Sequence, residues 1–133
     1  MADTSRVLKP FLSFLQKYTP FNNMLPAHQE YLAMHLEQVF YAENDEILAP
    51  NVGVANSLYI IKSGCVISEN SDAIRKFEPG HCFPINALFN KTAVNFQYHA
   101  IKSTICYQLT QSHFEYLMQQ SNIFHDFISN QTS

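Results

Sequence analysis

The stretch that decides the fold runs Gly80-His81-Cys82-Phe83-Pro84-Ile85-Asn86-Ala87-Leu88-Phe89. It opens with a glycine, and its last four residues suit a single helical turn. Pro84 fixes its own φ and has no backbone N–H, so it removes one hydrogen-bond donor from this region. The stretch therefore predicts a glycine turn followed by a short helical turn with one donor missing.

The segment that follows alternates between apolar and polar residues. The apolar positions are Val94, Phe96 and Tyr98, and the polar positions are Asn95, Gln97 and His99. Successive side chains of a strand point to opposite faces, so each set shares one face. If the Val94 face lines a pocket, that pocket is apolar and aromatic.

Short β-rich runs broken by turn residues fill the chain between residues 37 and 109. Strands this close together predict an all-β barrel or sandwich, and they leave no room for the helices of parallel βαβ units. Apolar residues at helical spacing flank this region on both sides. We expect one mainly β domain over residues 1–133, with N-terminal helices in 1–36, a barrel in 37–109 and C-terminal helices in 110–128.

Three further pieces of the sequence accompany the stretch at residues 80–100. They are Glu46-Ile47-Leu48 with Gly53, the run from Leu58 to Val66, and Cys106-Tyr107-Gln108-Leu109 followed by Phe114, Leu117 and Phe124. In this order and spacing, the four pieces resemble the cyclic-nucleotide-binding domain family over roughly residues 20 to 128. The resemblance implies a double-stranded β-helix, or jelly-roll, barrel, which limits exposed strand edges.

The family's phosphate-binding cassette runs Gly-x-x-Phe-Gly-Glu-x-Ala-Leu and, after a short loop, Arg-x-Ala-Thr-Val-x-Ala. The residues in register with it are Gly80, Phe83, Ala87, Leu88 and Ala100. In the family, the glutamate accepts hydrogen bonds from the ribose 2′-hydroxyl and the arginine pairs with the cyclic phosphate. Here the second glycine is Pro84, the glutamate is Ile85 and the arginine position falls on Val94. The two charged groups that hold the family's ligand are absent.

Each lost charge-assisted contact is worth roughly 1.5–3 kcal/mol, so losing two weakens binding by on the order of 10²- to 10⁴-fold. We therefore expect cAMP and cGMP to bind weakly or not at all. The candidate ligand-binding residues of this degenerate cassette are Phe83, Pro84, Ile85, Asn86, Ala87, Leu88, Lys91, Val94 and Phe96.

Three readings of this cassette remain open. The pocket could bind a different small molecule, since ligand sites are commonly apolar clefts with a few placed polar groups. It could still bind a cyclic nucleotide or another small ligand through Lys91 and the backbone N–H groups of the cassette. Alternatively, apolar side chains fill it and the domain is a structural module for protein interaction.

Near the C-terminus, Phe124-His125-Asp126-Phe127-Ile128 and the Gly-x-x-Phe-Pro-x-x-Ala-Leu form of the cassette resemble the input domain of bacterial signalling proteins. Those proteins also carry paired cystathionine-β-synthase-type domains and a nucleotidyltransferase-like domain. The resemblance implies a regulatory domain with a downstream effector domain as partner. Phe124, Phe127 and Ile128 share a helix face, which either packs on the barrel or forms an interface such as a homodimer.

Composition excludes several other functions. The formal net charge is -3, and the two arginines are Arg6 and Arg75, so no basic stripe for nucleic acid exists. No apolar run approaches the ~20 residues that span a bilayer and no signal pattern opens the chain, so we expect a cytoplasmic protein without membrane contact.

Enzymatic and metal sites are equally unsupported by the sequence. The three cysteines include no Cys-x-x-Cys pair, so we expect no disulfide, no metal and, for Cys65 and Cys106, the role of small buried hydrophobes. Hydrolase, zincin, Walker and dinucleotide motifs are missing. We expect neither enzymatic activity nor a cofactor.

Overall fold

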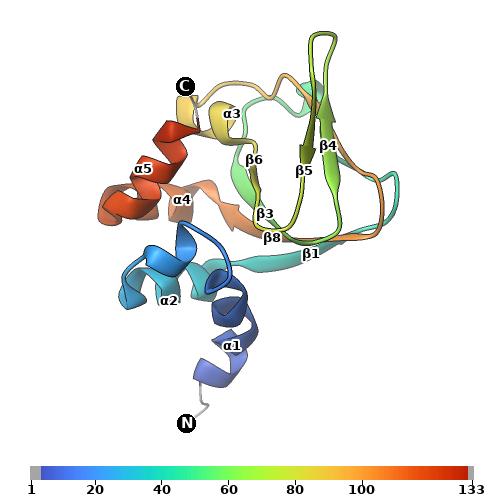
Figure 1. The fold of residues 1–133 in the computed structure, drawn as a ribbon. Coiled ribbons are helices and arrows are strands. Elements are labelled where there is room, and N and C mark those ends of the chain that lie inside the picture. The colour runs from blue at the N-terminus through green and yellow to red at the C-terminus, as the bar shows by residue number, and fades with distance from the viewer. Residues whose placement is uncertain (1–3, 132–133) are drawn as a thin grey trace.

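A computed structural model describes residues 4–131 and shows two antiparallel four-stranded sheets that form a barrel, with helices gathered on one side of it (Figure 1). The strands are β1 Glu37–Tyr41, β2 Glu46–Leu48, β3 Ser57–Ser63, β4 Val66–Glu69, β5 Ile74–Phe77, β6 Cys82–Phe83, β7 Gln97–Ala100 and β8 Thr104–Thr110. One sheet has the order β1-β8-β3-β6 and the other β2-β7-β4-β5. The predicted jelly-roll barrel with flanking helices is confirmed.

The first sheet holds the centre of the core. Strand β3 is buried from Ser57 to Ile61, and it pairs with β8 over most of its length, placing Leu58 opposite Leu109 and Ile60 opposite Tyr107. All four of these side chains are fully buried. β3 is therefore buried over its first five residues, as its almost continuous apolar run suggests.

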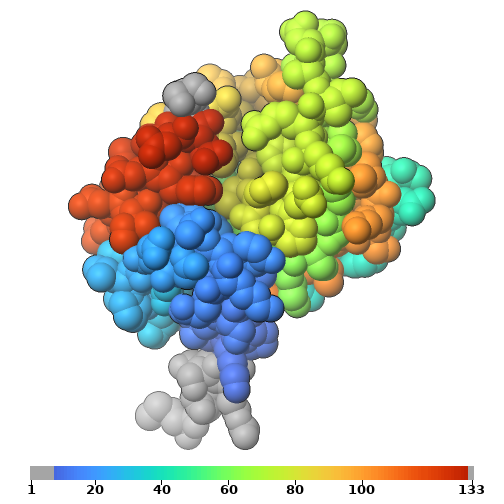
Figure 2. All heavy atoms as spheres, in the orientation of Figure 1, coloured from blue at the N-terminus to red at the C-terminus, as the bar shows by residue number. Residues whose placement is uncertain are grey.

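The second sheet carries the hairpin of β4 and β5, whose tip stands clear of the rest of the molecule (Figures 1 and 2). Asn70 closes this tip with an Asx-type turn, because its side-chain oxygen accepts from the backbone N–H groups of Asp72 and Ala73 at 2.8 and 3.0 Å. The hairpin lets β4 pair with β5 on one side and β7 on the other. This row of strands forms one wall of the site.

The helices come from both ends of the chain. They are α1 Thr4–Leu15, α2 Pro26–His35, α3 Ile85–Asn90, α4 Gln111–Gln120 and α5 Asn122–Asn130, with 3₁₀ turns at Phe21–Asn23 and Pro50–Val52. In Figure 2 the red atoms of α5 lie directly against the blue N-terminal segment, where the rings of Phe21 and Phe127 are 6.4 Å apart. Phe124 and Ile128 are fully buried. Of the two alternatives for this helix face, the structure shows the one that packs inward.

The ends of the elements lie within two residues of the predicted limits. The last strand runs to Thr110, one residue past the predicted barrel limit of 109, and α5 continues to Asn130 where the prediction ended at 128. α5 is a separate helix because Ser121 caps it, its hydroxyl accepting from the N–H of Phe124 at 3.1 Å. Residues 1–3 and 132–133 of the predicted domain lie outside the described residues.

The three cysteines are free and buried, so the prediction that Cys65 and Cys106 act as small buried hydrophobes is confirmed. Among residues 4–131, no helix combines the length and the apolar character needed to cross a membrane.

Candidate functional site

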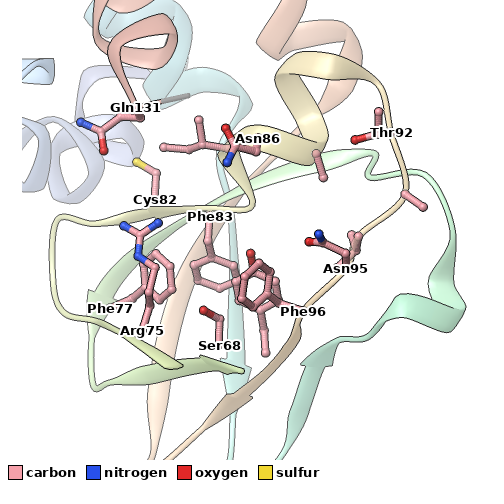
Figure 3. A pocket seen from close by; sticks show the side chains of 15 residues that line it. Ser68, Arg75, Phe77, Cys82, Phe83, Asn86, Thr92, Asn95, Phe96 and Gln131 are labelled. Carbon is pink, nitrogen blue, oxygen red and sulfur yellow. The ribbon is translucent and has the colours of Figure 1, made fainter. Parts of the chain in front are cut away.

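A cavity of about 220 Å³ lies between α3, its following loop and the inner face of the second sheet. It is lined by Ser68, Arg75, Phe77, Cys82, Phe83, Ile85, Asn86, Ala87, Thr92, Ala93, Val94, Asn95, Phe96, Tyr98 and Gln131. In Figure 3, Arg75 and Phe77 lie at one end of the group and Thr92 and Asn95 at the other. The cavity thus joins residues that are up to half the chain apart.

Aromatic rings make up much of its wall. The rings of Phe83 and Tyr98 are stacked with centroids 5.0 Å apart, and Tyr59 stacks behind Phe83 at 5.3 Å. Phe77 lies 5.5 Å from Phe83, and Phe96 lies 6.4 Å from Tyr98. Such pairs hold one another in fixed orientations. The flat faces of the wall are therefore held in place by ring packing.

A polar row crosses the same wall from strand to strand. Ser68 on β4 is directly paired with Arg75 on β5 and with Tyr98 on β7. Residues directly opposite in neighbouring antiparallel strands point to the same face, and all three line the cavity. A hydroxyl, a guanidinium and a phenol thus stand side by side.

The groups of this row lack partners within residues 4–131. Ser68 is 1% exposed, yet its hydroxyl makes no hydrogen bond to another described residue. The guanidinium of Arg75 lies 5.0 Å from the ring centroid of Phe77 and forms no ion pair with a described carboxylate. Because all three residues line the cavity, these donors are available to a ligand.

Burial raises the pKa of two lining groups further above neutral pH. It raises the pKa of Tyr98 to about 12, although the charge of Arg75 opposes the rise. It likewise raises the pKa of the Cys82 thiol to about 12. Both groups are protonated at neutral pH, so Tyr98 is a hydrogen-bond donor and Cys82 is a poor nucleophile.

Six of the nine predicted ligand-binding residues line the cavity, namely Phe83, Ile85, Asn86, Ala87, Val94 and Phe96. Three do not. Pro84 sits at the N-cap of α3, and Leu88 is buried in the core. Lys91 has left-handed backbone at the C-cap of α3, and its Nζ lies 3.4 Å from Oε1 of Glu115. The geometry therefore does not bring Lys91 to the pocket.

The sequence prediction missed several lining residues, of which Arg75 matters most. It lies outside the cassette and reaches the cavity only because β5 folds back on β4. One signal was available: Arg75 and Phe77 are two apart in a strand, so they share a face. Ser68 and Gln131 had no comparable signal, since pairing across strands and the path of α5 place them.

The site has the composition of a binding pocket. Within residues 4–131, no cluster of three His, Cys, Asp or Glu side chains that could hold a metal is found. The lining residues offer aromatic faces, neutral hydrogen-bonding groups and a single cation. This arrangement suits recognition of a small organic molecule.

The family model described as "Cyclic nucleotide-binding domain" matches residues 38–121 of this chain. No curated protein gives a match in sequence. Solved structures do resemble it. The regulatory domain of Toxoplasma gondii protein kinase A, co-crystallised with cAMP, is 17% identical with a TM-score of 0.82, over 96% of this chain and 50% of the other.

Two trypanosomal structures extend the comparison. The regulatory subunit of a cAMP-independent protein kinase A from Trypanosoma cruzi, bound to guanosine, is 18% identical with a TM-score of 0.82, over 97% of this chain and 47% of the other. A triple mutant of the corresponding Trypanosoma brucei subunit, with cAMP in its A site, is 19% identical with a TM-score of 0.84, over 96% and 48%. The chain spans about half the length of these proteins, and identities this low show the fold alone.

Proposed function

Because this chain belongs to the cyclic nucleotide-binding domain family, we propose that it is a non-catalytic regulatory module that senses a small organic ligand in its barrel cavity. The proposed ligand does not depend on the usual cyclic-phosphate contacts. One observation carries the proposal: the cavity is present and bears unpaired donors, although Ile85 and Val94 stand where the family has its ligand-holding charges.

The related structures include both cAMP-bound domains, such as that of Toxoplasma gondii, and one bound to a different ligand. The Trypanosoma cruzi subunit, described as cAMP-independent, holds guanosine, which has an aromatic base and no phosphate. The cAMP-bound Trypanosoma brucei subunit is a mutant in which one of three substitutions introduces an arginine for a threonine. An arginine offers bidentate hydrogen bonds suited to phosphate. This pattern agrees with a pocket that lacks the cassette arginine and takes a different ligand.

The alternative of a cyclic-nucleotide sensor that uses Lys91 receives no support from the geometry, because Lys91 pairs with Glu115 outside the cavity. We extend the proposal to a cytoplasmic input domain of a bacterial signalling protein with a downstream effector domain. It is supported by the resemblance at Phe124-His125-Asp126-Phe127-Ile128.

The variant Phe96→Ala should bind any cavity ligand about tenfold more weakly than the native chain, since a lost aromatic contact costs roughly 0.5–1.5 kcal/mol beyond burial. A panel of nucleosides and aromatic metabolites is screened by thermal shift, and the best compound is titrated by calorimetry. Phe40→Ala is the matched control, because Phe40 is 63% exposed on β1 and does not line the cavity. If no panel compound binds, or if both variants lose affinity equally, the proposed function is wrong.

A further inference from the structure

We infer that the ligand of this cavity is a small planar aromatic compound with one anionic group, and that Arg75, Ser68 and Tyr98 receive that group. The inference rests on the proposed function and names its ligand class. Arg75 on β5 and Ser68 on β4 lie outside the cassette from which the family's two ligand-holding charges come, and Tyr98 lies within it on β7.

The three side chains of this row can all donate hydrogen bonds to an anionic group. Its members are neighbours across three strands, because Ser68 is paired with both Arg75 and Tyr98. Arg75 presents a planar fork of N–H groups, and each hydroxyl adds one donor. A carboxylate or phosphate ester could accept from all three, and hydrogen bonds from a guanidinium to such groups are short and strong.

The charges around the row favour an anion over a neutral acceptor. Arg75 is the single cation among the described lining residues, and no carboxylate is among them. The Tyr98 phenol is protonated at neutral pH, and burial raises its pKa further, to about 12. The row therefore carries one net positive charge and offers donors without a competing acid.

The guanidinium is also held in place. It packs over the ring of Phe77, 5.0 Å from the centroid, a cation–π contact that favours this position of the side chain. Arg75 is nonetheless exposed to solvent, so water screens its charge. We therefore expect Arg75 to contribute a binding free energy near the lower end of the range for a charge-assisted hydrogen bond.

The aromatic part of the ligand follows from the remaining wall. The stacked rings of Phe83 and Tyr98 lie next to the row, with Phe96 beyond them. A cavity of about 220 Å³ is below the usual ~300–1,000 Å³ of ligand sites. It fits a ligand of one or two fused rings with a small substituent.

The predicted ligand would lie in the opposite orientation to a cyclic nucleotide bound by the cassette. In the family pattern the phosphate partner falls at Val94, and its neighbour Asn95 lies at the far end of the cavity from Arg75 in Figure 3. The anionic end of the ligand should lie at Arg75, while its ring extends toward Phe96.

Two matched pairs of compounds test this inference by calorimetry at pH 7: indole-3-carboxylate against indole, and phenyl phosphate against phenol. In at least one pair, the anionic member should bind about tenfold more tightly than its neutral partner. Arg75→Gln should abolish that preference. Lys91→Gln is the control, because it removes a cassette cation outside the cavity and should change nothing. The two pairs also distinguish a carboxylate ligand from a phosphate ester.

The outcomes separate this inference from the proposed function. If neutral and anionic partners bind the native chain equally, or if Arg75→Gln keeps the preference, the inference is wrong while a ligand site remains. If none of the four compounds binds and the wider panel also fails, both are wrong. Thermal melting of Arg75→Gln confirms that the variant is folded, and Ser68→Ala gives a second, smaller loss of the same preference.

Discussion

The double variant Ile85→Glu/Val94→Arg is expected to bind cAMP about 10²- to 10⁴-fold more tightly than the native chain. Both positions line the cavity, and the two substitutions restore the ribose and phosphate partners of the family pattern. Each restored charge-assisted contact is worth roughly 1.5–3 kcal/mol. Calorimetric titration of both proteins with cAMP measures the change.

A matched control is Ile85→Gln/Val94→Met, which has side chains of similar length without the charges. Val94 is 2% exposed, so a new arginine there is costly to bury without a ligand, and the folding of both variants is checked by thermal melting. Equal affinity of the charged and uncharged double variants for cAMP would contradict the role we assign to these two positions.

Gly64→Ala is expected to destabilise the fold by roughly 2–4 kcal/mol, from left-handed backbone strain and overpacking. Gly64 has a φ of 101°, and an added Cβ would lie 2.6 Å from the backbone oxygen of Ser103 and closer still to Oγ1 of Thr104. That threonine cannot easily yield, because it is fully buried and its Oγ1 accepts from the N–H of Cys65 at 3.2 Å. Urea unfolding measures the free energy.

Gly53→Ala separates the two causes. Gly53 also has positive φ, at 83°, but an added Cβ meets nothing within 4 Å. The free energy of unfolding should fall only by the conformational cost of roughly 1–3 kcal/mol, because φ 83° with ψ -142° is a region that essentially only glycine occupies. If Gly53→Ala destabilises as much as Gly64→Ala, the close approach at Thr104 is not what requires glycine there.

The fold could be predicted because short stretches of the sequence, each interpretable by itself, indicate its helices and strands. Helical spacing correctly placed the flanking helices. Alternation was less reliable, because the strand begins only at Gln97 and Asn95 lines the cavity together with Val94, Phe96 and Tyr98. The cassette stretch gave the position of α3, because the glycine and the Asn86–Phe89 turn are local features. These signals depend only on residues that are close in sequence, so they can be interpreted without knowing which strands pair.

The site could be predicted only in part because its chemistry depends on pairing between strands. Arg75 and Ser68 meet Tyr98 through the register of β5, β4 and β7, which no motif encodes. Lys91 was chosen because it lies in the cassette loop. Its left-handed C-cap backbone and its contact with Glu115 turn it elsewhere. Proximity in sequence was therefore a poor guide to which cation reaches the cavity.

Titration of the native chain with cAMP and cGMP tests the central claim most directly. That claim is that this domain keeps the family's cavity without its cyclic-nucleotide contacts. Calorimetry should show no binding of either nucleotide with a dissociation constant below about 100 µM, given the two lost contacts. A dissociation constant near 1 µM or tighter, which requires about 8 kcal/mol of binding free energy, would contradict the account.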